Sequence, residues 1–125
     1  MPSLKLLLTI TAPLAFVFGP GFLVLPELTV APFGAVLDPA GALVARLYGA
    51  MHMGLALINW LARDLVEAAG RRAVAAGNLV YFALAAVVAA TGVLLGAANA
   101  LILINTAVFG LLALAFARHV IRSDA

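Results

Sequence analysis

A long uncharged stretch dominates the second half of this chain. No charged side chain occurs from Ala73 to Ala117, and the middle of the stretch, from Gly96 to Asn99, is rich in residues suited to a turn. A membrane-spanning helix needs about 20 apolar residues to cross about 30 Å of hydrocarbon. The stretch is long enough for two such helices, so it predicts two membrane spans joined by a tight hairpin.

The composition of the whole chain also indicates that lipid surrounds it. Of the 125 residues, 66% are hydrophobic and 10% are charged, whereas a soluble domain carries about 25% charged residues. The net charge of +2 comes from scattered basic residues and indicates no nucleic-acid partner. Cysteine is absent, which excludes disulfides, thiolate metal sites and thiol redox chemistry.

Four spans account for residues 1–125 as a single all-α transmembrane domain, an integral membrane four-helix bundle. We expect the spans at about 4–25, 39–62, 72–95 and 100–118. Lys5 and the apolar run after it resemble a secretory signal, but no small-x-small cleavage site follows, so the first span is expected to be retained. Pro13 and Pro20 lie inside this span and predict kinks.

The connections between the spans carry turn and cap signals. Asp38 is a good N-cap and Pro39 a good first helical residue, which predicts a clean start for the second span. Residues 63–67 are expected to extend that span as an exposed turn, which Gly70 would end. The first loop, residues 26–38, is expected to form no regular element because several helix breakers interrupt it: Pro26, Pro32 and Gly34.

The basic residues predict the orientation of the chain in a cell membrane. Only Arg46 lies toward one side of the predicted spans, and the other six basic residues fall on the opposite side: Lys5, Arg63, Arg71, Arg72, Arg118 and Arg122. The positive-inside rule then places both termini and the second loop in the cytoplasm. We therefore expect a multi-pass protein with Glu27 and Asp38 on the outer side.

A polar stripe on the second span is the main candidate for a functional site. Tyr48, His52, Asn59 and Arg63 recur at spacings of four, seven and four, which places them on one face of a helix. One interpretation is a polar pocket or a proton-handling site, because histidine titrates near neutral pH. The other is interhelical hydrogen bonding that holds the bundle together, which is common in membrane proteins and is favoured.

Further polar residues within the spans extend this hypothesis. Asn105 is expected near the middle of the fourth span, at the depth of His52, so these two side chains could meet, and Asn59 could meet Asn78 in the same way. Arg46 would either reach the outer surface and pair with a carboxylate there, Glu27 or Asp38, or hold an anionic headgroup or substrate. The candidate ligand-binding residues are thus Arg46, Tyr48, His52, Asn59 and Asn105.

Small residues on the third span indicate close helix packing. Gly92 and Gly96 form a GxxxG pattern near its outer end, and alanines fill much of the rest. Small side chains let helix backbones approach closely, within one chain or between copies. The pattern is therefore compatible with an oligomer, although packing within one chain explains it equally well.

The chain offers few groups for catalysis or cofactor binding. His52 and His119 differ by about half a bilayer in predicted depth, so one chain cannot use both on a haem or a metal. No cofactor is expected; a single axial bond from His52 to a haem or pigment is the one option. No span contains a carboxylate, which disfavours a proton-coupled transporter. An enzyme would depend on a thin set: Arg46, His52, Glu27 and Asp38.

The first half of the chain resembles a known pattern. Leu37-Asp38-Pro39-Ala40-Gly41, Ala45-Arg46-Leu47-Tyr48-Gly49 with Gly54, Leu61-Ala62-Arg63 and the outer-loop segment Leu25-Pro26-Glu27 look like small bacterial four-span membrane proteins of the DoxX-like kind. The resemblance implies a compact four-helix bundle and transfers no catalytic residue. Some proteins of this kind are accessory subunits of respiratory or redox membrane complexes, which implies a partner role.

Three functions remain open at this point. The favoured one is a non-enzymatic membrane subunit that assembles with copies of itself or with a larger complex and binds a lipid or apolar molecule. The alternative is a small-solute transporter or channel that uses the stripe of Tyr48, His52 and Asn59. The third is a lipid-modifying enzyme at the outer interface.

Overall fold

The computed structural model of the chain describes residues 2–122, and every regular element in this part is a helix. The elements are α1 (Leu4–Val24), α2 (Pro26–Val30), the 3-10 helix η1 (Ala31–Phe33), α3 (Pro39–Ala62), α4 (Ala68–Leu94) and α5 (Ile102–Ile121). Four of them, α1, α3, α4 and α5, are long and apolar enough to cross a membrane. The predicted all-α class and the four long apolar helices are confirmed, and they indicate a multi-pass membrane protein.

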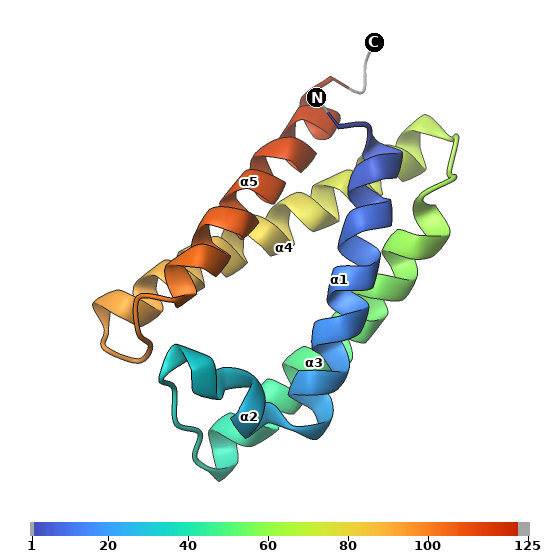
Figure 1. Cartoon of the computed structure of the whole chain (residues 1–125). Coiled ribbons are helices and arrows are strands. Elements are labelled where there is room, and N and C mark those ends of the chain that lie inside the picture. Colours follow the sequence, from blue (N-terminus) through green and yellow to red (C-terminus); the bar gives the residue numbers. More distant parts are fainter. Residues whose placement is uncertain (1, 123–125) are drawn as a thin grey trace.

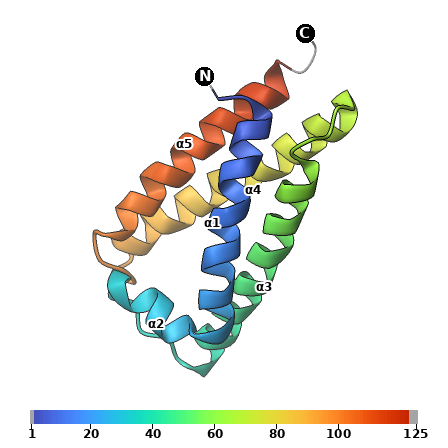
Figure 2. The same cartoon turned by 45° about the vertical axis from the view of Figure 1, so that its right-hand side comes forward.

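The four long helices are arranged as two pairs. Helix α1 packs along α3 and α4 packs along α5, whereas the contacts between the pairs are much narrower (Figures 1 and 2). The start of α1, the α3–α4 turn and the end of α5 all lie at one end of the molecule (Figure 1). We call this the arginine-rich end, because all the basic residues except Arg46 and His52 belong to these segments.

The start of α3 follows the predicted capping pattern. Asp38 has an extended backbone, its Oδ1 accepts a hydrogen bond from the Gly41 backbone N–H at 2.6 Å, and Pro39 is the first helical residue. The carboxylate thereby satisfies one of the backbone donors that have no partner within the helix.

The turn between α3 and α4 is shorter than expected. Helix α3 ends at Ala62 and α4 begins at Ala68, so the prediction that Gly70 ends an extension of the second span is wrong. Gly70 instead lies in the first turn of α4, where a Cβ atom would be 2.7 Å from Leu65 Cδ2. The missing side chain lets Leu65 fold back onto the start of α4, which makes the turn tight.

The loop after α1 is helical over residues 26–33, which corrects that part of the prediction for residues 26–38, whereas residues 34–38 form no regular element, as predicted. Pro26 is the first residue of α2, and Pro32 lies in the first turn of η1. Proline is tolerated at both places because the first backbone N–H groups of a helix need no helical partner. The loop also contacts the α4–α5 turn, because Asn99 donates from its backbone N–H to the Phe33 carbonyl at 2.7 Å and from Nδ2 to the Pro32 carbonyl at 3.0 Å.

Gly96 ends α4 and does not form a packing surface with Gly92. Its φ of 70° is left-handed, its N–H donates to the Val93 carbonyl, and the Ala97 N–H donates to the Gly92 carbonyl at 2.8 Å. This is the Schellman arrangement that terminates many helices, and glycine adopts it without the steric penalty of a Cβ. The predicted GxxxG helix face is therefore wrong.

Each pair is held by a different kind of contact. In the α1–α3 pair a Cβ at Gly49 would lie 2.6 Å from the Leu23 backbone nitrogen and 2.7 Å from the Gly19 carbonyl oxygen. In the α4–α5 pair the rings of Phe82 and Phe116 stack with centroids 5.8 Å apart and planes at 9°. The buried core centres on these two rings, together with Ala75, Ala113 and the first turns of α1: Leu4, Leu7 and Leu8.

Charged side chains lie mainly at the ends of the long helices. At the arginine-rich end Lys5 Nζ contacts Asp64 Oδ1 at 2.5 Å, and this hydrogen bond lowers the pKa of the exposed Asp64 carboxyl. Arg46 is exposed, and within residues 2–122 it forms no ion pair with Glu27 or Asp38. The predicted pairing of Arg46 with an outer carboxylate is therefore not formed.

Candidate functional site

The polar stripe on α3 forms two separate clusters. Tyr48 and His52, in the part of the stripe farther from the arginine-rich end, contact Tyr81 of α4. Asn59, in the part nearer that end, contacts Thr11 of α1 and Asn78 of α4. His52 and Asn59 are seven residues apart, which is about 10 Å of helix rise. We call the two groups the tyrosine–histidine cluster (Tyr48, His52, Tyr81) and the amide cluster (Thr11, Asn59, Asn78).

The tyrosine–histidine cluster is an ordered chain of hydrogen bonds. His52 Nδ1 lies 3.2 Å from the Tyr48 carbonyl oxygen, which can only accept, so Nδ1 carries the proton and donates. In a neutral ring Nε2 then accepts from the Tyr81 hydroxyl at 2.8 Å, and the Tyr81 oxygen is left to accept from the Tyr48 hydroxyl at 2.9 Å. Both ring nitrogens of His52 therefore have partners.

Aromatic rings enclose this chain. The Tyr48 ring meets His52 edge to face at 4.2 Å and Phe22 of α1 at 5.0 Å, and the Tyr81 ring meets His52 at 5.6 Å. The His52 side chain is 7% exposed. Burial with both nitrogens satisfied is the geometry of a packing contact, and a role of these residues in ligand binding stays a prediction.

The amide cluster joins three helices at one buried point. Asn59 and Asn78 exchange two hydrogen bonds, at 2.9 and 2.8 Å, and Asn59 Nδ2 also donates to Thr11 Oγ1 at 3.0 Å. Asn59 is 0% exposed, and Asn78 donates in addition to the Val74 carbonyl at 3.0 Å. Among the described residues no buried side-chain nitrogen or oxygen lacks a partner. The predicted meeting of Asn59 with Asn78 is confirmed.

The structure does not bring the other candidate residues to these clusters. Asn105 lies in the first turn of α5 and not at its middle, because α5 begins at Ile102. Its side chain has no hydrogen bond to another residue in the range 2–122, and the expected pairing with His52 is not formed since His52 uses both nitrogens elsewhere. Arg63 stacks on Trp60 at 3.8 Å at the end of α3.

Two members of the clusters were missed from the sequence. Tyr81 follows Asn78 by three residues, so both lie on one face of α4, and this spacing was a signal that both point into the molecule. Thr11 gave no comparable signal, because threonine is common in apolar helices and also bonds its own helix, here the Leu7 carbonyl at 2.9 Å.

The contacts that these clusters form are hydrogen bonds between side chains and to the backbone. Within the described residues no group of three or more His, Cys, Asp or Glu side chains is placed to hold a metal ion. An axial bond from His52 Nε2 to a haem or pigment would require loss of the Tyr81 hydrogen bond. Axial ligation by His52 therefore stays a prediction.

An open apolar groove runs along the α4–α5 pair. It has a volume of about 660 Å³, and most of the residues that line it are alanine, glycine or leucine. Ala83 and Ala86 of α4 line it together with Ala107, Gly110 and Ala117 of α5. The exposed side chains of Leu111 and Leu114, which we call the leucine ridge, line it as well. A Cβ at Gly110 would meet nothing within 4 Å, so space is left at this position.

Comparisons with models of protein families, with curated proteins and with solved structures found no match. The resemblance to DoxX-like membrane proteins therefore stays a prediction.

Proposed function

We propose that this chain is a non-enzymatic integral membrane protein that works as a subunit of a homo-oligomer. The observation that carries the proposal is the apolar groove along α4 and α5 with its exposed leucine ridge. The proposed partner in the groove is a second copy of the same chain.

Small side chains make the groove suitable for a helix of a second copy. Lipid tails are as apolar as leucine, so helices in a membrane associate through close packing and not through exclusion of water. The alanines and Gly110 expose backbone to such close approach. Leucines and small residues on one surface also suit a two-fold dimer, because the axis would place the leucine ridge of each copy, Leu111 and Leu114, against the small residues of the other.

The polar groups inside the spans support a structural role over transport. A solute path would need polar groups that are available to the solute, whereas the stripe of Tyr48, His52 and Asn59 bonds to other side chains of the same chain. The residues proposed for a lipid-modifying enzyme do not form an ion-paired site within residues 2–122, since Arg46 is exposed and has no ion pair with Glu27 or Asp38. We further propose that the arginine-rich end faces the cytoplasm.

The first test fills the groove without disturbing the single chain. Gly110→Leu places a side chain in open space, and Gly77→Leu is the matched control because a Cβ there also meets nothing within 4 Å. We expect wild type to have a dimeric or larger mass in mild detergent by light scattering. Gly110→Leu should weaken the association by about fivefold or more, since overpacking costs about 1–3 kcal/mol, and Gly77→Leu should not.

The second test uses the absence of cysteine in the chain. A single Leu114→Cys variant should form a disulfide-linked dimer under mild oxidation in membranes, because Leu114 is 71% exposed on the proposed two-fold surface. Leu57→Cys, 59% exposed on α3 and also in the half near the arginine-rich end, is the control and should stay monomeric. A monomeric wild type together with equal cross-linking of both variants would refute the proposal.

A further inference from the structure

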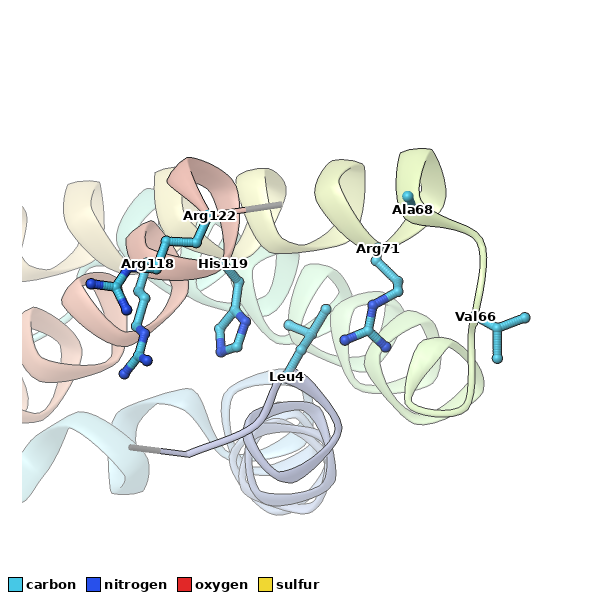
Figure 3. A pocket seen from close by; sticks show the side chains of 7 residues that line it. All are labelled: Leu4, Val66, Ala68, Arg71, Arg118, His119 and Arg122. Atoms are coloured by element: carbon cyan, nitrogen blue, oxygen red, sulfur yellow. The ribbon is translucent and has the colours of Figure 1, made fainter. Parts of the chain in front are cut away.

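A basic pocket lies at the arginine-rich end of the molecule. It has a volume of about 350 Å³ and lies between the first turn of α1, the start of α4 and the end of α5. Arg71 lies on one side of Leu4, and Arg118 and His119 lie on the other (Figure 3). The remaining lining residues are Val66, Ala68 and Arg122.

Within residues 2–122 the charged residues that line this pocket are all basic, although Glu67 lies between two of the lining residues, Val66 and Ala68. The Asp64 carboxylate, at the same end, is held by Lys5 at 2.5 Å and by Arg63 at 3.5 Å. Within residues 2–122 no carboxylate forms an ion pair with the pocket arginines: Arg71, Arg118 and Arg122.

Hydrogen bonds to backbone carbonyl groups hold two of the lining side chains in place. Arg71 Nη1 donates to the Leu65 carbonyl at 3.0 Å, and His119 Nε2 donates to the Pro2 carbonyl at 3.2 Å. The guanidinium group of Arg71, fixed in this way, loses less side-chain entropy when a ligand binds. A guanidinium group can also bind two phosphate oxygens with two parallel N–H groups. Leu4 and Ala68 are also the first residues of α1 and α4, so the positive ends of two helix dipoles lie at the pocket, together with the negative end of one, α5.

We propose that this pocket binds the phosphate group of a ligand whose net charge is negative. An anionic phospholipid and a soluble phosphate share this chemistry. Its place at the ends of the spans and the apolar side chains beside the arginines, Leu4 and Val66, favour the lipid, whose acyl chains would continue along the helices. Basic pockets between membrane helices recognise such headgroups in the same way.

The test measures lipid preference in the full-length protein. Purified protein in detergent is titrated with phosphatidylglycerol or phosphatidylcholine, and bound lipid is counted by native mass spectrometry. Phosphatidylcholine has the same phosphate, but its choline balances the charge. We expect wild type to prefer phosphatidylglycerol at least about fivefold, because each arginine near a membrane surface contributes about that factor toward anionic lipid.

Two variants separate the pocket from general basic charge. Arg118→Gln combined with Arg122→Gln should lower the preference by at least about fivefold, the contribution of one arginine, since Arg71 remains in the pocket. Arg72→Gln should retain the preference, because Arg72 lies at the same end and is not among the pocket-lining residues. A second experiment measures the melting temperature of the wild type and of the double variant with and without inorganic phosphate. If phosphate raises the melting temperature of wild type but not of the double variant, and lipid preference is absent, the site takes a soluble phosphate.

Two results would overturn the proposal. One is a wild-type protein that shows neither a preference for phosphatidylglycerol nor stabilisation by inorganic phosphate, a result that needs no variant to fold. The other is an equal loss of preference in Arg72→Gln, which would assign the effect to net charge and not to the pocket.

Discussion

The α1–α3 and α4–α5 pairs pack in opposite ways. Between α1 and α3 the backbones meet at Gly19 and Gly49, where no side chain fits. Between α4 and α5 the space is filled by large rings, with Phe116 fully buried against Phe82. Exclusion of water contributes little to helix association inside a membrane, so each pair depends on shape. The stability of the α1–α3 pair should therefore fall when atoms are added at its glycines, and that of the α4–α5 pair should fall when ring atoms are removed.

The largest effect is expected when one methyl group is added to the α1–α3 pair. In Gly49→Ala the new Cβ would lie 2.6 Å from a backbone nitrogen of α1, which cannot move without moving the helix. We expect a loss of about 3 kcal/mol in the free energy of unfolding, at the upper end for overpacking, measured by denaturation in mixed micelles. Gly54→Ala is the control, because its Cβ meets nothing within 4 Å. Equal stability of the two variants would contradict the close backbone contact.

The α4–α5 pair should lose stability when one of its buried aromatic rings is removed. Phe116→Ala leaves a cavity beside Phe82, and we expect a loss of about 2 kcal/mol. The loss should be smaller than in a soluble core, because the unfolded side chain stays in lipid and only the packing term is lost. Phe16→Ala on α1 removes an exposed ring and should change the free energy of unfolding by less than about 0.5 kcal/mol. If both deletions have the same effect, the stacked rings do not stabilise the pair.

The smallest effect concerns the amide cluster, which joins α1, α3 and α4. Asn59→Leu removes its bonds to Thr11 and Asn78 and should cost about 1 kcal/mol, because polar contacts between membrane helices contribute modestly. A double-mutant cycle with Asn78→Leu checks the cause. The double variant should lose less stability than the sum of the single variants, since neither then leaves an unpaired amide. Strict additivity would show that the two amides act independently.

The sequence predicted some local features and contacts of this chain correctly and others wrongly. Asp38 and Pro39 placed the start of α3 correctly, because a cap needs only neighbouring residues. Asn59 and Asn78 were matched correctly, since both are polar and lie in the halves of α3 and α4 that are nearer the arginine-rich end. The possible contact of His52 with Asn105 is not formed, because Asn105 lies in the first turn of α5 and because Tyr81 bonds to the ring nitrogen.

The glycines show where sequence reasoning ends. Gly49 is pressed against another backbone, Gly54 and Gly110 face open space, and Gly96 terminates a helix. In a soluble protein the periodic change from apolar to polar residues shows which face of a helix is buried. In lipid the outer face is apolar as well, so this signal is nearly absent.

The amino-acid sequence by itself determined that four long apolar helices form, and that the basic residues other than Arg46 and His52 belong to the segments at one end. Both properties are sums over many residues along one helix, and neither depends on which neighbour the helix meets. Only the tertiary structure decided that the helices pack as two pairs, and that three arginines from two helices line one pocket. These features depend on the rotation and depth of each helix, which close packing in three dimensions sets and hydropathy along the chain does not.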